Sequence, residues 1–428
     1  AWSHGGIIVG YAGILALLIG WVLVMPLAVD RSAQWMRRLA GRYFGPISRM
    51  AAGGVSANLS RTSVAVAALM VAVAASTGVG IMVGSFRTTV GTWLEQVLQA
   101  DVYIQPPSGG GRLGEAGILP AAEALLRNTE GVASAYAIRR TEVLTTLGRV
   151  ELAAVETGPH SRRSTQLVDG DAVAAIDRLE AGSHVLVSEP LAWRRGLAPG
   201  DSIGFETPLG RRMMAVAGVY YDYASDQGVV MMDRSVYREM YGDDAISGLA
   251  VFASRDTTPA GLIERLRESG SGVQNLVIRS NAELRAYSLD VFDRTFTVTA
   301  VLRLLTVVVA FVGILSALLA LQLERRSEFA VLRANGMTRS QLGRMIRLQC
   351  ALMGMQAGLL AVPLGLALAW TLIHVINLRS FGWTLQFEAG PALLLQGVAV
   401  AVLAALAAGW LPARWIARIE PTEAVRAT

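Results

Sequence analysis

Two glycine-containing patterns decide whether this chain could bind a nucleotide itself. The phosphate-binding loop G-x-x-x-x-G-K-[S/T] needs a lysine to reach the phosphates, and all 38 basic residues here are arginine. The chain therefore does not hydrolyse ATP by that route. Gly109, Gly111 and Gly114 match G-x-G-x-x-G, the spacing of a dinucleotide-binding turn. Pro106 and Pro107 interrupt the approach to it, so a flexible loop is favoured over a cofactor site.

Histidine and methionine offer no clearer chemistry. No H-E-x-x-H zinc motif occurs, and four histidines are scattered along the chain: His4, His160, His184 and His374. The pairs Met213-Met214 and Met231-Met232 could suggest copper ligation. Successive residues of a strand point to opposite faces, so core packing is favoured for both pairs. We predict no metal site, no bound cofactor and no catalytic residue in this chain.

Composition indicates a membrane protein. Hydrophobic residues make up 53% and charged residues 17% of the chain, and the mean hydropathy is +0.44, which is unusual for a soluble protein of this length. A helix of about 20 apolar residues crosses the hydrocarbon core of a bilayer. Five nearly uncharged segments reach that length: Gly5 to Leu27, Ser63 to Val83, Leu304 to Leu323, Leu348 to Ile376 and Pro391 to Leu411.

The placement of arginine orients these spans. Six arginines and one aspartate lie between residues 28 and 62, and six arginines lie between residues 325 and 347. Both connections are cytoplasmic by the positive-inside rule, so the N-terminus and residues 88 to 298 lie outside and the C-terminal tail lies inside. The pI of 9.6 then reflects topology and indicates no nucleic-acid partner. We predict a multi-pass protein of the inner (cytoplasmic) membrane.

Few polar groups fall inside the spans. Gln356 and Gln396 are expected to form hydrogen bonds between helices, and Pro363 can kink the fourth span. No carboxylate lies within a span, which argues against a proton- or ion-coupled transporter.

The outer segment of about 210 residues is long enough for one or two compact domains. It has no disulfide, because the single cysteine, Cys350, lies at the start of the fourth span. Alternation and turn residues predict a mixed α/β domain. The expected strands are 102–105, 142–155, 184–188, 211–221, 229–232, 249–253 and 274–279, and the expected helices are 121–128 and 259–269.

Apolar residues at helical spacing continue from the second span and lead into the third. They predict that both membrane helices extend outward as a stalk, although amphipathic connectors at the lipid interface are an equal alternative. The predicted stalk residues are Phe86, Val90, Trp93 and Val97 on one side and Leu284, Tyr287 and Val291 on the other.

Residues that end one helix and begin another are concentrated in the segment Glu324 to Arg347. Helix formers run to Asn335, and Gly336 follows where a left-handed residue ends a helix. Thr338 and Gln341 have capping-box spacing, so a second helix is predicted to begin at about Arg339. Met337 and Leu342 occupy the positions of a hydrophobic staple. This capped helical hairpin could merely join two spans, or it could be where another protein pushes.

The hairpin sequence ERRSEFAVLRANGMTRSQL resembles the cytoplasmic segment of the FtsX-like permeases, the MacB and lipoprotein-releasing type of ABC transporter. Their pattern R-x-x-E-[F/I]-x-x-L-R-A-x-G is matched from Arg325 to Gly336. Residues 56–62 resemble the amphipathic entry of such a unit, and 411–414 with 419–426 resemble its C-terminal signature. The resemblance implies that a partner ATPase contacts Glu324, Arg325, Glu328, Phe329, Leu332, Arg333, Gly336 and Arg339.

The expected fold is an α-helical membrane protein of five transmembrane helices with a mixed α/β extracytoplasmic domain. The resemblance implies a four-span unit, so the first span is assigned to a preceding unit and the chain to the C-terminal half of a two-unit protein. The expected parts are a preceding helix (1–30), a cytoplasmic linker and entry helix (31–62), a span with stalk (63–100), a MacB-like periplasmic core domain (101–283), a stalk with span (284–323), the coupling hairpin (324–347), two spans (348–411) and a cytoplasmic tail (412–428).

The function implied by the resemblance is that of an ABC transporter permease, not an enzyme. A cytoplasmic ABC ATPase, acting as a dimer and carrying ATP and Mg²⁺, would drive extrusion or release of a lipoprotein, lipid or other amphipathic substrate by mechanotransmission. Membrane lipids and a periplasmic or lipoprotein partner complete the expected contacts. The alternative is a membrane-anchored signalling or binding protein whose outer domain regulates an envelope hydrolase.

Overall fold

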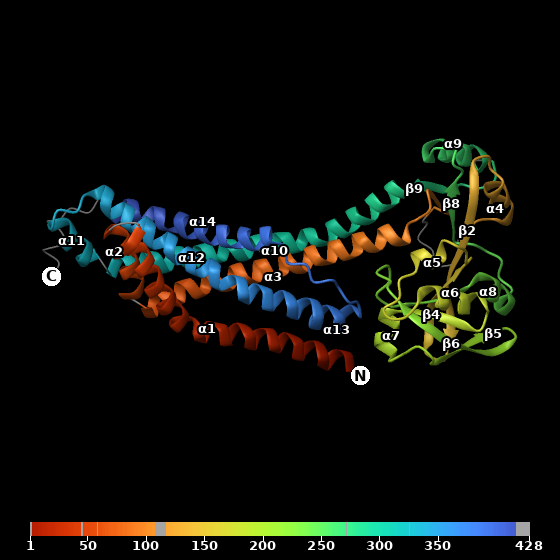
Figure 1. Cartoon of the computed structure of the whole chain (residues 1–428), viewed down its shortest axis with the longest axis horizontal. Coiled ribbons are helices and arrows are strands. Elements are labelled where there is room, and N and C mark those ends of the chain that lie inside the picture. Colours follow the sequence, from red (N-terminus) through yellow and green to blue (C-terminus); the bar gives the residue numbers. More distant parts are fainter. Residues whose placement is uncertain are drawn as a thin grey trace. The chain divides into compact units, whose positions relative to one another are not determined.

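The computed structural model describes residues 2–43, 46–57, 59–107, 117–270, 272–324 and 326–416 (Figure 1). The G-x-G-x-x-G glycines, Arg325 and the end of the C-terminal signature lie outside these residues. The chain divides into two compact units. The membrane unit comprises residues 1–86, 295–380 and 385–428, and the outer unit comprises residues 87–294 with 381–384.

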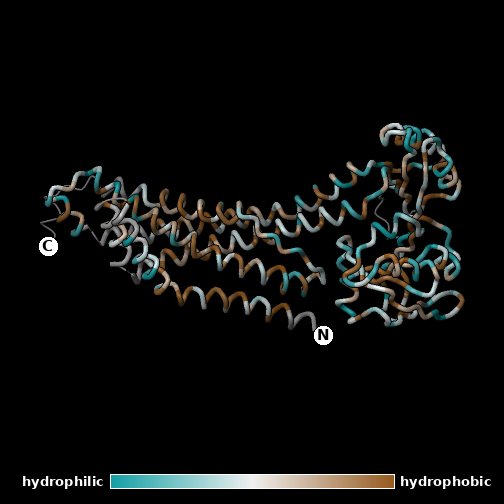
Figure 2. The backbone as a smooth tube through the Cα atoms, viewed as in Figure 1, coloured by the Kyte–Doolittle hydropathy of each residue, from teal (hydrophilic) through white to brown (hydrophobic). Residues whose placement is uncertain are grey.

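Long apolar helices build the membrane unit. Five helices in the described residues are long and apolar enough to cross a membrane, which confirms the predicted number of spans. The third candidate span, Asn281–Gly313, begins earlier than the predicted 304–323. The apolar residues of these helices are brown in Figure 2. Together with the shorter helices beside them, the helical elements of this part of the chain are α1 (Trp2–Tyr43), α2 (Pro46–Ala57), α3 (Leu59–Val97), α10 (Asn281–Glu324), α11 (Arg326–Ala334), α12 (Arg339–Thr371), the π-helix η1 (Leu372–Asn377), α13 (Leu378–Phe381) and α14 (Pro391–Ile416). α3 and α10 continue into the outer unit.

Small residues let these helices approach closely. A Cβ atom added to Gly358 of α12 would lie 2.9 Å from the Cα of Val398 in α14, and one added to Gly354 would lie 2.8 Å from the carbonyl oxygen of Ala401. A Cβ atom on Gly78 of α3 would lie 3.1 Å from the carbonyl oxygen of Gly365. The small-xxx-small spacing of α12 is therefore explained by contact between helix backbones.

α12 contains the polar residue Gln356 and the proline Pro363, for which the sequence predicted a bond between helices and a kink. Gln356 of α12 donates from its Nε2 to Ser32 Oγ at 3.1 Å and to the Val29 carbonyl at 3.4 Å, both in α1. The predicted bond between helices is confirmed, and it attaches α1 to the other spans. α12 runs without a break through Pro363. The departure from α-helical geometry comes later, at η1.

The outer unit is built on one mixed sheet, which confirms the predicted α/β class. Within the described residues the strand order is β3-β7-β4-β6-β5-β2-β8-β1-β9, and β2 also pairs with β3. β3 with β7 and β4 with β6 are parallel, and the other pairs are antiparallel. The strands are β1 (Val102–Gln105), β2 (Val132–Thr145), β3 (Gly148–Val155), β4 (His184–Ser188), β5 (Ser202–Thr207), β6 (Gly210–Tyr220), β7 (Val229–Asp233), β8 (Gly248–Ala253) and β9 (Val277–Ser280).

Helices of the outer unit cover this sheet and close its cores. One core gathers Phe205, Leu152 and Val187 with α8, and a second gathers Ile104, Leu126 and Leu262 between the sheet, α4 and α9. The helices are α4 (Pro120–Arg127), α5 (Ser161–Ser164), α6 (Ala172–Glu180), α7 (Glu189–Arg195), α8 (Arg234–Tyr241) and α9 (Pro259–Gly270).

One strand prediction in this unit is wrong. The stretch 142–155 is not a single strand, because it contains the turn of the β2–β3 hairpin, with Gly148 at a φ of +96°. A turn needing positive φ favours glycine, and that signal was present in the sequence. β5, α5, α6, α7, α8 and the part of β2 before residue 142 were not predicted. The remaining predicted strands and both predicted helices are found within a few residues of their expected bounds.

Candidate functional site

The coupling hairpin, residues 324–347, ends its first helix as the sequence predicts. Gly336 has a φ of +94°. Its N–H donates to the Arg333 carbonyl at 3.0 Å, and the Met337 N–H donates to the Leu332 carbonyl at 3.1 Å. This pair of bonds is a Schellman motif. The turn between α11 and α12 is therefore set by backbone geometry that only glycine adopts without strain.

The second helix of the hairpin begins with a reciprocal cap. The Thr338 hydroxyl accepts from the Gln341 N–H at 3.3 Å, and Gln341 Oε1 accepts from the Thr338 N–H at 2.9 Å. The capping box is confirmed, and α12 starts at Arg339 as expected. Met337 is partly buried and packs against the membrane core that contains Leu342. These contacts hold the turn at the start of Arg339–Phe381, the longest candidate membrane span in the described residues.

The predicted coupling residues divide into two groups by burial. Phe329 is 3% exposed and belongs to the membrane core, and Leu332 packs against it. Glu328, Gly336 and Arg339 are exposed, whereas Arg333 is half-buried. Glu324 is the last residue of α10. The apolar members pack α11 against the membrane core, and Glu328, Gly336 and Arg339 are exposed to solvent.

Sequence reasoning missed one residue of this surface. Val331 of α11 is 60% exposed, although it lies between the core-facing residues Phe329 and Leu332. A protein that docked on this side of the hairpin would bury this apolar side chain. The signal was available, because Val331 falls outside the helical stripe of Phe329, Leu332 and Arg333.

The predicted stalk helices are joined at their outer ends by polar contacts. In the outer unit, Arg87 of α3 pairs with Asp293 of α10 at 3.0 Å, and Glu95 pairs with Arg285. Asn281 starts α10 and donates from Nδ2 to the carbonyls of Leu98 and Ala100 at 2.6 and 2.9 Å. The outer ends of α3 and α10, residues 87–97 and 281–294, are therefore linked near both of their limits.

The predicted stalk residues do not all face the partner helix. In the outer unit Val90 is buried and Trp93 is half-buried, whereas Val97, Tyr287 and Val291 are exposed. Leu284 is half-buried. In the membrane unit the Phe86 ring contacts the Phe296 ring edge-on, with centroids 5.2 Å apart. The structure therefore brings part of the apolar stripe together and leaves part of it facing outward.

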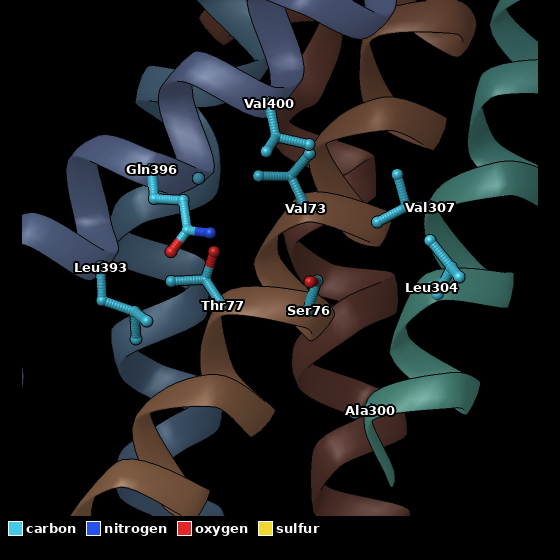
Figure 3. Close-up of a pocket in the computed structure, with 10 residues that line it drawn as sticks. Val73, Ser76, Thr77, Ala300, Leu304, Val307, Leu393, Gln396 and Val400 are labelled. Carbon is cyan, nitrogen blue, oxygen red and sulfur yellow. The ribbon is translucent and has the colours of Figure 1, made fainter. Parts of the chain in front are cut away.

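A cavity of about 440 Å³ lies in the membrane unit between α3, α10 and α14 (Figure 3). Its walls are mostly apolar, and Gln396 of α14 and Thr77 of α3 point toward one another within it. Such a volume suits a small or chain-like ligand. The lining residues are Val73, Ser76, Thr77, Ala300, Leu304, Val307, Leu393, Gln396, Gly397 and Val400. Gln396 thus lines a cavity, and sequence reasoning had given it only a bond between helices.

Within the described ranges, no group of three or more His, Cys, Asp or Glu side chains could hold a metal ion. The candidate sites in this part of the chain are the capped hairpin, the paired helices of the predicted stalk and the intramembrane cavity.

Known proteins match both units. Residues 300–421 match the FtsX-like permease C-terminal family, and residues 62–269 match the MacB-like periplasmic core domain family. An uncharacterized ABC transporter permease protein of Mycobacterium tuberculosis, Rv0987, is 41% identical over 435 residues, covering 99% of this chain and 50% of that protein. A macrolide export ATP-binding/permease protein MacB of Agrobacterium fabrum is 22% identical over 397 residues, covering 88% of this chain and 60% of that protein.

The periplasmic region of MacB from Actinobacillus actinomycetemcomitans aligns with 14% identity and a TM-score of 0.34, covering 45% of this chain and 94% of that structure. The assignment of the outer domain rests on the family match. The chain spans about half the length of the curated relatives it matches. It belongs to the FtsX-like permeases, as a multi-pass membrane homologue of ABC transporter permeases whose MacB-like core domain lies outside the cytoplasm.

Proposed function

We propose that this chain couples ATP hydrolysis on a separate cytoplasmic ABC ATPase, acting as a dimer, to the extrusion or release of a lipoprotein, lipid or other amphipathic substrate. The observation that carries the proposal is the coupling hairpin. Its turn is fixed by a Schellman motif and a capping box, its inner face is fastened by Phe329, and its outer face presents Val331. A hairpin with a fixed turn and an exposed apolar side chain is suited to be displaced by a protein that binds it.

The same geometry supports a route for that push. α12 leaves the hairpin at Arg339 and crosses the membrane as one helix, so a displacement of the turn displaces the span. α3 and α10 continue from the membrane unit into the outer unit and are linked there by ion pairs. Movement of their membrane portions would reach the core domain along these continuous helices, which is the mechanotransmission scheme. No residue of this chain needs to bind ATP or Mg²⁺.

The cavity supports the class of substrate. It is walled by apolar side chains with Ser76, Thr77 and Gln396 as polar groups. An acyl chain with an ester or amide linkage has matching chemistry, because the chain fills apolar space and the linkage accepts hydrogen bonds from hydroxyl and amide groups. Membrane lipids and lipid-modified proteins are therefore the partners that fit this cavity.

Val331→Asp tests the coupling contact. The full-length chain, co-expressed with its ATPase, is purified in detergent and the bound ATPase is quantified. We expect the affinity for the ATPase to fall about thirtyfold or more, because a charge placed in a desolvated apolar contact costs about 2 kcal/mol or more. Val331 faces solvent, so the fold of the permease itself should be retained.

Leu209→Asp is the matched control, since Leu209 is an exposed apolar residue of the outer domain. It should retain full ATPase binding. Equal binding by wild type, Val331→Asp and Leu209→Asp would contradict the assignment of the hairpin as the ATPase contact.

A further inference from the structure

Four residues between the fourth and fifth spans belong to the outer unit. Residues 381–384, here called the strap, cluster with residues 87–294, although residues 380 and 385 on either side belong to the membrane unit. The strap begins with Phe381, the last residue of α13, and has no regular secondary structure after it. A short loop that only joins two spans needs no contact with the core domain, whereas the strap belongs to the same compact unit as that domain.

The strap is bound through its backbone. The Thr384 N–H donates to Glu189 Oε2 at 3.2 Å, and the Thr384 carbonyl accepts from the Tyr223 hydroxyl at 2.9 Å. Both polar groups of one peptide residue are thus satisfied by side chains of the core domain. Glu189 is buried, and burial raises the pKa of its carboxyl group. A buried carboxyl group is unfavourable unless it accepts hydrogen bonds. The bond from the Thr384 N–H therefore stabilises Glu189 as well as the strap.

The strap also fits the core domain sterically. Gly382 has a φ of +78°, and a Cβ atom there would lie 2.9 Å from the Cα of Pro190. Only glycine satisfies both the backbone conformation and the close approach. Trp383 is buried, and its ring meets the Tyr223 ring edge-on at 5.8 Å. The strap therefore docks by shape as well as by hydrogen bonds.

Tyr223 joins the strap to the stalk. Its ring meets the Trp93 ring of α3 edge-on at 5.7 Å, and Trp93 Nε1 donates to the Tyr221 carbonyl at 3.1 Å. Trp93 was predicted from sequence as a stalk residue. The strap and the stalk thus converge on one aromatic cluster of the core domain.

The other end of the same loop is held in the membrane unit. The Glu388 N–H donates to Ser85 Oγ at 3.0 Å, and the Ser85 hydroxyl is 3.4 Å from the Glu388 carbonyl. Ser85 is fully buried in α3. The loop thus has one contact within each unit: Thr384 in the outer unit and Glu388 in the membrane unit.

We propose that the strap is a second mechanical route into the core domain, separate from the stalk. α12, η1 and α13 lead from the coupling hairpin to the strap along one helical path, so displacement of the hairpin would pull on Glu189, Pro190 and Tyr223. The π-helical segment η1 lies just before the strap, and such segments often occur at functional positions. This inference rests on the proposed function, because it needs an ATPase that moves the hairpin.

The docking itself is tested first, on the full-length chain in lipid nanodiscs. Hydrogen–deuterium exchange is followed in peptides covering the strap. Gly382→Val should undock it and accelerate exchange of the Thr384 amide about fivefold or more, as expected for loss of its hydrogen bond. Gly390→Val is the matched control, since a Cβ atom at Gly390 meets nothing within 4 Å, and it should leave the exchange rate unchanged.

The transmission is tested with the ATPase bound. Exchange in α7, which contains Glu189 and Pro190, is compared between ADP and ATP with vanadate. We expect a nucleotide-dependent change in wild type and Gly390→Val and its loss in Gly382→Val, with the change in residues 87–97 of the stalk retained. Tyr223→Phe, which removes one hydrogen bond and keeps the ring, should reduce the change in α7 without abolishing it.

The two hypotheses fail differently. If wild type shows a nucleotide-dependent change in α7 and Gly382→Val shows the same change, the strap is not a route and the proposed function stands. If nucleotide alters exchange in neither the hairpin, the stalk nor α7 of wild type, the proposed function is contradicted together with the strap.

Discussion

At the scale of single residues, the core domain holds a carboxyl group whose burial is unfavourable. Asp222 is 6% exposed and accepts a hydrogen bond from the Ala224 N–H at 2.9 Å. Desolvation raises the pKa of Asp222 above its ordinary value. A carboxyl whose pKa is higher in the folded than in the unfolded state costs stability when ionised. This cost is full at neutral pH and disappears as the pH falls through the folded-state pKa.

Asp222→Asn should therefore stabilise the protein at neutral pH. The amide keeps an oxygen for the Ala224 N–H and removes the desolvated charge. The Tm of the full-length protein, measured in detergent, should exceed that of wild type at about pH 7, and the difference should shrink towards about pH 4. Asp226→Asn, an exposed change in the same turn, is the control and should leave the Tm within the small range of surface substitutions. An Asp222→Asn effect independent of pH would exclude the charge as its cause.

At the scale of elements, local signals predicted the structure where one short pattern decides it. The Schellman turn at Gly336, the capping box at Thr338 and the strand from His184 to Ser188 were correct, because each depends on a few adjacent residues. The β2–β3 hairpin was missed because strand-like residues flank its short turn on both sides, and the single turn signal, Gly148, was not used. The strap contacts join Glu189 and Tyr223 to Thr384, which lie far apart in the sequence. Such juxtapositions depend on the tertiary fold, and no spacing reveals them.

The packing of α12 on α14 gives a prediction at this scale. Gly358→Val should destabilise the membrane unit, because the added Cβ atom would lie 2.9 Å from the Val398 backbone and force the helices apart. We expect a loss of about 1–3 kcal/mol, typical of overpacking, seen as a lower Tm in detergent. Gly20→Val in α1 is the control, since nothing lies within 4 Å of a Cβ atom there. Equal Tm values for both variants would mean that α12 and α14 do not rely on this close approach.

At the scale of the whole molecule, the proposed function requires the hairpin and the core domain to lie on opposite sides of the membrane. The arginine-rich connections support this arrangement, and the family match places the core domain outside the cytoplasm. If the proposed function is correct, movement of the hairpin reaches the core domain through the spans that connect the two sides.

Labelling of one introduced cysteine at a time tests that arrangement. Leu209→Cys and Val331→Cys place thiols at positions that are 84% and 60% exposed. Leu209→Cys should react with a membrane-impermeant maleimide in cells whose inner membrane is intact, whereas Val331→Cys should react only after that membrane is permeabilised. Wild type is the background control, because its one cysteine, Cys350, is 1% exposed and should stay unlabelled. Labelling of Val331→Cys in intact cells would place the hairpin outside the cytoplasm, where no ATPase could push it.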